Sequence, residues 1–174
     1  MTPSTPIPTY PTTVEASHAI LEATPATLRA LLVSVPEAIV TRAGAEGWSA
    51  KDVLAHLVVN EGVANARFRA IATEEMPAIL NVDEQEALHA SGMREQSVVT
   101  LLAEFDRRRR VGTTHLRRQT LEALARQGLL DVAGPISALD LLHQRAWHDL
   151  NHIRQAAALL AEPLDEHRGN LRVF

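Results

Sequence analysis

The segment that decides the fold is SAKDVLAHL, residues 49–57, because it combines a strong helix start with the beginning of a long amphipathic pattern. Ser49 and Asp52 have the spacing of a capping box, with Asp in place of the usual Glu or Gln. Apolar residues then recur at helical spacing on one face: Val53, Leu54, Leu57, Ala64, Phe68 and Ile71. We therefore predict a long amphipathic helix over about residues 50–73.

A second start of the same kind, Ser137-Ala-Leu-Asp140, predicts a last long helix that Pro163 ends. A third long helix is predicted over about residues 94–127, with a short one near residues 83–89 and a connection over residues 128–134. The apolar residues of the third helix at helical spacing include Val98, Leu101, Leu102 and Phe105.

The first helical region begins at Val14, according to its composition. Thr24 followed by Pro25 predicts an N-cap with proline at the first helical position, and Pro36 interrupts the region. No alternating β pattern of useful length appears. Four helices in a chain of 174 residues predict an all-α domain, a four-helix bundle.

Composition agrees with one packed domain and excludes several functions. Hydrophobic residues make up 46% and aromatic residues 3%, so the core is aliphatic, and no apolar run is long enough for a membrane span. The net charge of −4 gives no general attraction to nucleic acid or anionic membranes. With no cysteine, the chain has no disulfide, no thiolate ligand and no cysteine nucleophile.

Residues 1–13 hold four of the nine prolines and are expected to form a flexible or extended arm ahead of a single domain over residues 14–174. This segment lacks the basic and then apolar layout of a signal peptide, so we expect a cytoplasmic protein.

Eight histidines without any cysteine mean that a tightly held transition metal would need imidazole ligands, with help from carboxylates. His148 and His152 are four residues apart, on one side of a helix between its apolar and polar faces. His56 has a similar place on the helix over residues 50–73. Three imidazoles from two helices, with a fourth position open, match a catalytic divalent metal; ordinary hydrogen-bonded histidines at a cleft edge are the alternative.

The remaining histidines are expected to lie away from this site. His143 is predicted to face elsewhere, and surface positions are predicted for His18, His89, His115 and His167.

Two carboxylates accompany the three histidines. Glu61 projects into the apolar face of its helix, so it is snorkelling, salt-bridged or part of a site. Asp149 stands where the metalloprotease pattern His-Glu-x-x-His would have its general-base Glu, and this shorter side chain argues against that class of enzyme.

Two segments resemble the DinB-like (DinB/YfiT) family. The first is GWSAKDVLAHL, residues 47–57, with Glu61 following; the second is GPIS, residues 134–137, followed by DLL at 140–142 and HDLNHIRQ at 148–155. The resemblance covers about residues 21–161. It implies a four-helix bundle, often a homodimer, in which His56, His148 and His152 hold a divalent metal, with zinc or nickel expected. Asn60 is a departure, because relatives frequently have Asp there.

The resemblance also implies a function. Family members are described as metal-dependent hydrolases, or as transferases and isomerases that use low-molecular-weight thiols, and they are associated with damage-inducible genes. We expect an enzyme whose metal activates water or an external thiol toward a small-molecule substrate, with Glu61 and Asp149 as candidate catalytic bases or ligand-orienting groups. The alternative is a non-catalytic, stress-associated bundle that binds a metal or a small ligand.

A nucleic-acid surface is the third hypothesis, because six arginines fall within residues 107–118. The run Arg107 to Arg110 wraps around its helix, however, and only Phe68 and Phe105 on the long middle helices could stack on bases. A solvated face or salt bridges explain the run better.

Overall fold

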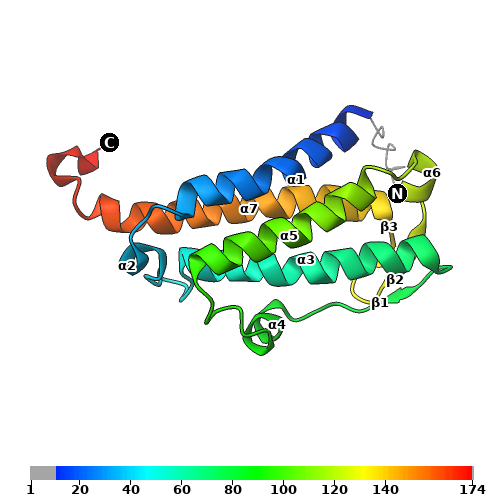
Figure 1. The fold of residues 1–174 in the computed structure, drawn as a ribbon, viewed down its shortest axis with the longest axis horizontal. Helices are drawn as coiled ribbons and strands as arrows, with labels where there is room; N and C mark the ends of the chain where they lie inside the picture. The colour runs from blue at the N-terminus through cyan, green and yellow to red at the C-terminus, as the bar shows by residue number, and fades with distance from the viewer. Residues whose placement is uncertain (1–10, 174) are drawn as a thin grey trace, which may run out of the picture.

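Four long helices run side by side along the length of the molecule (Figure 1). The computed structural model describes residues 11–173, so the part of the expected arm over residues 1–10 lies outside the described residues. The bundle helices are α1 (Pro11–Leu32), α3 (Ala50–Thr73), α5 (Val98–Leu116) and α7 (Ala138–Asp165). α1 packs against α5 and α7, and α3 packs against the same two helices, which places α1 and α3 at opposite corners. The predicted four-helix bundle is confirmed.

Short elements fill the connections. They are the helices α2 (Glu37–Val40), α4 (Glu84–Ala90) and α6 (Leu121–Leu124), the strands β1 (Ala78–Ile79), β2 (Gln127–Leu130) and β3 (Gly134–Ser137), and the 3₁₀ helix η1 (Gly169–Val173). β2 pairs in parallel with β1 and antiparallel with β3, in the order β1-β2-β3. No helix among the described residues is long and apolar enough to span a membrane.

Both predicted capping boxes are present. Ser49 Oγ accepts from Asp52 N at 3.1 Å while Asp52 Oδ2 accepts from Ser49 N at 2.9 Å, and Ser137 and Asp140 repeat the pair at the start of α7. Each box satisfies two backbone donors that the first helical turn leaves free. The histidines of interest follow these two fixed starts.

The first helix differs from its prediction. α1 is continuous from Pro11 to Leu32, so residues 11–13 belong to the helix and not to an arm. Thr24 is no N-cap, because its hydroxyl donates to Ile20 O at 2.8 Å one turn back. Pro25 cannot donate to Leu21 O, and Arg109 Nη1 donates to that carbonyl instead, at 2.8 Å. A side chain of α5 thus replaces the hydrogen bond that proline removes.

The third predicted helix is wrong in its extent. α5 starts at Val98 behind the N-cap Ser97 and ends at Leu116, well before residue 127. The connection expected over residues 128–134 overlaps two of the three strands of the small sheet, β2 and β3. Strands of two to four residues are too short to show an alternating pattern. α7 also passes Pro163 and ends at Asp165.

The connection between α3 and α5, residues 74–97, runs back along the bundle beside α3 (Figure 1). α3 and α5 start at the same end of the molecule, so the chain must return over the length of α3 before α5 begins. α4 lies on this return path and packs against α3. The return path forms one wall of the cleft described below.

Candidate metal centre

The three predicted histidines meet at one point in the structure. His56 lies on the second turn of α3 and is buried, while His148 and His152 lie one turn apart on α7 and are half-buried. His148 Nε2 is 3.2 Å from His56 Nε2 and 3.1 Å from His152 Nε2. All three ligand atoms lie within 4.8 Å of one another. Two helices that are far apart in the sequence therefore present three imidazole nitrogens to a common point.

This donor set fits a divalent transition metal. Imidazole nitrogens bind zinc at about 2.0–2.1 Å, so nitrogens that share one ion lie about 3 Å apart. The two Nε2 separations around His148 have this value. Imidazole also suits zinc and nickel, and three ligands leave coordination positions for solvent or substrate.

Two of the three imidazoles are uncharged, the form in which they can bind a cation. Burial, together with the neighbouring His152 ring, lowers the pKa of His56 to about 4. Burial also lowers the pKa of His148 to about 3, with further contributions from the other two imidazoles and from Arg109 and Arg145. Both rings are therefore neutral at pH 7, and the neutral ring is the form that binds a metal.

Neighbouring side chains orient the rings. Gln155 Oε1 lies 2.7 Å from His152 Nδ1 and can only accept, so Nδ1 carries the proton and Nε2 presents its lone pair to the cluster. The amide nitrogen of Asn60 lies 3.3 Å from His148 Nδ1. Trp48 packs edge-on against the His56 ring, with centroids 5.7 Å apart.

The two predicted carboxylates lie beside the histidines in a buried ion-pair network. Glu61 accepts from Arg109 Nη2 at 2.7 Å and also pairs with Arg145. Both oxygens of Asp149 accept from Arg109, at 2.5 and 3.0 Å. The salt-bridged alternative for Glu61 is confirmed. Within residues 11–173, neither carboxylate forms a hydrogen bond or ion pair with the three imidazoles, and all four side chains of the network are at most 4% exposed.

This network joins all four bundle helices. Glu61 comes from α3, Arg109 from α5 and both Arg145 and Asp149 from α7, while Arg109 also binds the Leu21 carbonyl of α1. Gly112 makes room for it, because a Cβ there would clash with Asn65 Oδ1, which accepts from Arg145 Nη1, and would lie 3.1 Å from both Arg145 guanidinium nitrogens.

Sequence reasoning missed Arg109 as a core residue, although a signal was present. Within the run Arg107 to Arg110, only Arg109 continues the apolar stripe of Leu102 and Phe105 toward Leu116. Four other arginines of the stretch form ion pairs with Glu or Asp side chains of the same chain: Arg107, Arg108, Arg110 and Arg117. Salt bridges therefore explain much of the basic stretch.

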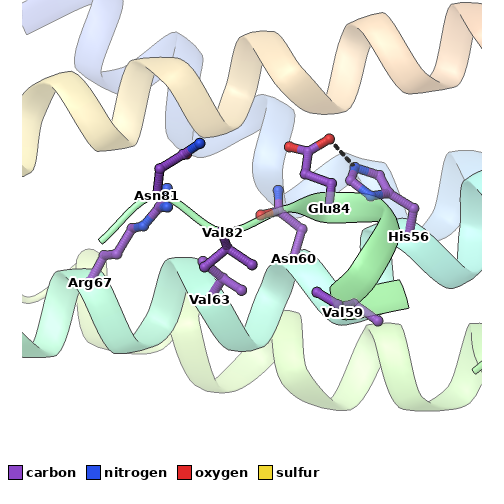
Figure 2. A pocket seen from close by; sticks show the side chains of 9 residues that line it. His56, Val59, Asn60, Val63, Arg67, Asn81, Val82 and Glu84 are labelled. Atoms are coloured by element: carbon purple, nitrogen blue, oxygen red, sulfur yellow. Dashed lines mark ion pairs between the residues drawn. The ribbon is translucent and has the colours of Figure 1, made fainter. Parts of the chain in front are cut away.

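A cleft opens beside the three histidines, between α3 and the segment over residues 81–87. Its empty volume is about 340 Å³ and its polar lining includes His56, Asn60, Arg67, Asn81 and Glu84. Figure 2 shows Glu84 directed toward the His56 ring, with Oε2 3.8 Å from His56 Nε2. The Glu84 side chain is 60% exposed, so it is free to move toward a ligand. Sequence reasoning missed Glu84, because only the return path of the chain brings it to α3.

Of the other histidines, one departs from its prediction. His18, expected at the surface, is buried at 4% exposure on α1. His143 faces away from the cluster as predicted, with Nδ1 2.8 Å from Ser17 Oγ. His89, His115 and His167 are exposed, as predicted.

Comparisons with known proteins bear on the family and on the fold of the chain. Residues 20–156 match the sequence model of the family described as the DinB superfamily. A search of curated proteins finds no match. Among solved structures, the chain is similar to YfiT from Bacillus subtilis, which is described as "a probable metal-dependent hydrolase with an unusual four-helix bundle topology". The TM-score is 0.83 at 21% identity, over 92% of this chain and 93% of that one, a likeness of fold.

Proposed function

Since the chain belongs to the DinB superfamily, we propose that it is a metal-dependent hydrolase of small molecules whose divalent ion, zinc or nickel, is held by His56, His148 and His152. The observation that carries the proposal is the meeting of three imidazoles, two of which burial keeps neutral, at the edge of an open cleft. The similarity to YfiT, described as a probable metal-dependent hydrolase, supports the same reaction class.

The residues around the cluster have distinct roles in this proposal. A divalent ion held by three imidazoles supplies Lewis acidity and lowers the pKa of water, so that a nucleophile is present near neutral pH. Glu84 accepts the proton from the attacking water, because its exposed carboxylate reaches the cleft side of His56. Asn60, which lines the cleft next to His148, is placed to donate a hydrogen bond to the substrate. Glu61 and Asp149, whose oxygens are occupied by arginine, support α3 and α7 behind the histidines.

The test begins with protein stripped by a chelator and reloaded with one equivalent of Zn²⁺ or Ni²⁺. Reloaded protein should hydrolyse activated esters in an ester and amide screen, and His148→Ala should lose the metal and the activity while its helical circular dichroism is retained. His167→Ala changes an exposed histidine and serves as the matched control. Full activity after complete metal removal would contradict the proposal.

Glu84→Gln tests the carboxylate separately. It should lower kcat by about 10²-fold or more with metal content unchanged, whereas Glu86→Gln, on the exposed side of α4, should have no effect. An external thiol belongs in the same screen, because the chain has no cysteine of its own and thiol transfer would need one. A large loss of thermal stability on chelation, without turnover in any assay, would favour a structural metal instead.

A further inference from the structure

The cleft beside His56 continues along one face of α3 as far as Arg67. Residues 56 and 67 are eleven positions apart, close to three helical turns, so their side chains share a face about 16 Å apart along the axis. Val63 lies on the same face between them, opposite Val82 on the return path (Figure 2). An adjoining cleft of about 430 Å³ shares Asn60, Arg67 and Glu84 and reaches His148. One elongated space therefore connects the histidine cluster with Arg67.

The Arg67 guanidinium lacks a counter-ion within residues 11–173. Its Nη2 donates to Leu80 O at 3.2 Å, its Nε is buried without a hydrogen-bond partner, and it forms no ion pair with a carboxylate of residues 11–173. Nη1 also has no partner among the described side chains and carbonyls. A half-buried cation without an anion is unfavourable, because the surrounding protein replaces part of its water shell. A ligand anion at this end of the cleft would remove that cost.

The walls between the two ends are suited to an organic molecule. Val63, Val82 and Phe68 supply apolar surface, while Asn81 and Gln144 supply amides. At the other end, Glu84 adds a negative charge next to His56. The charges of the cleft therefore lie at opposite ends: the Arg67 guanidinium, without a counter-ion in the described part of the chain, at one end, and the Glu84 carboxylate beside the histidine cluster at the other.

We propose that this cleft binds a small organic carboxylate, with the carboxylate group on Arg67 and the bond to be cleaved at the three-histidine end. The inference rests on the proposed hydrolase function and names its substrate class. A planar carboxylate matches the guanidinium, which can donate two parallel hydrogen bonds to it. A single negative charge also matches a cleft with an arginine that is unpaired within residues 11–173 at one end and a glutamate at the other.

Phenylacetate and its neutral isostere phenylacetamide are suitable probes, and their binding is followed by protein NMR with Zn²⁺-loaded and with metal-free protein. We expect phenylacetate to bind about tenfold or more tightly than phenylacetamide in both forms. Arg67→Gln should abolish this preference. Arg69→Gln removes the same charge from an exposed position of the same helix and should keep it.

Three results would overturn the inference. One is equal binding of the two probes by the wild-type protein. Another is a preference for phenylacetate that survives in Arg67→Gln. If that surviving preference disappears only when the metal is removed, the carboxylate binds the metal and not Arg67. The third is tighter Arg67-dependent binding of phenyl phosphate than of phenylacetate, which would make a phosphate, and not a carboxylate, the group that Arg67 binds. Arg67-dependent binding of phenylacetate by a protein that hydrolyses no ester would support the anion site and contradict the hydrolase.

Discussion

At the scale of single residues, the candidate site depends on which ring nitrogen of His152 carries the proton. Gln155 accepts from His152 Nδ1 at 2.7 Å, and this contact directs the free lone pair of His152 toward the other two rings. Gln155→Leu removes the acceptor without a large change of volume. Loss of such an orienting partner typically weakens metal binding by about 10–100-fold.

The measurement is competition for Zn²⁺ against a chromophoric chelator. Gln155→Glu keeps an acceptor in place and should bind zinc at least as tightly as the wild-type protein. Equal zinc affinity of Gln155→Leu and wild type would show that the contact has no influence on the site.

The buried imidazoles also predict how the stability of the metal-free protein depends on pH. His56 and His148 have pKa values of about 4 and about 3 when folded, against about 6.5 in an unfolded chain. The contribution of the two rings to the free energy of unfolding is complete above pH 6.5. It is lost as the pH falls toward 4, because the unfolded chain then binds more protons than the folded chain does. Each ring contributes a slope of up to about 1.4 kcal/mol per pH unit.

Urea denaturation of metal-free protein between pH 7 and pH 5 measures this effect. The double variant His56→Gln/His148→Gln should show a clearly smaller slope. A wild-type unfolding free energy that stays constant over this window would contradict neutral, buried rings.

The sequence indicated the three histidines through the four-residue spacing of His148 and His152, the similar helix position of His56 and the resemblance to the DinB-like family. It could not predict Glu84 or Arg67 as their neighbours. Glu84 reaches α3 only through the return path of the chain, and Arg67 has significance only because no described carboxylate pairs with it.

At the scale of elements, α1 shows why a local rule can fail. Proline in a helix interior is unfavourable because its ring clashes with the preceding turn and because it leaves a carbonyl without its donor. Arg109, 84 residues further along the chain than Pro25, supplies that donor to Leu21 O. No local pattern could reveal the contact, so the sequence predicted a new helix start at Thr24 where the structure continues one helix.

The same arginine predicts a large effect on stability. Arg109→Met leaves Asp149 without its buried partner, removes one of two arginines from Glu61 and frees the Leu21 carbonyl. Removal of one member of a buried ion pair typically costs about 3–5 kcal/mol. Arg110→Met is the matched control, because Arg110 is exposed and pairs only within its helix, so its cost should stay below about 1 kcal/mol.

Chemical denaturation of both variants, followed by circular dichroism, gives the comparison. Similar losses for Arg109→Met and Arg110→Met would mean that the network does not hold the four helices together.

At the scale of the whole molecule, two apolar clusters lie on either side of the charged network. One is centred on Leu54, Leu101 and Phe105, and the other includes Leu21, Phe68 and Leu142. The fold class followed from helix starts and apolar stripes, which are local features. The small sheet did not follow from the sequence, because strands this short are defined by their pairing partners. The true end of α5 did not follow either.

The proposed activity depends on one divalent ion bound between His56, His148 and His152. The most direct measurement is anomalous X-ray diffraction from crystals of the full chain grown with Zn²⁺, recorded on both sides of the zinc absorption edge. We predict one strong anomalous peak within about 2.0–2.1 Å of Nε2 of His56, His148 and His152. Zinc that binds elsewhere, with no peak between these three nitrogens, would contradict the account.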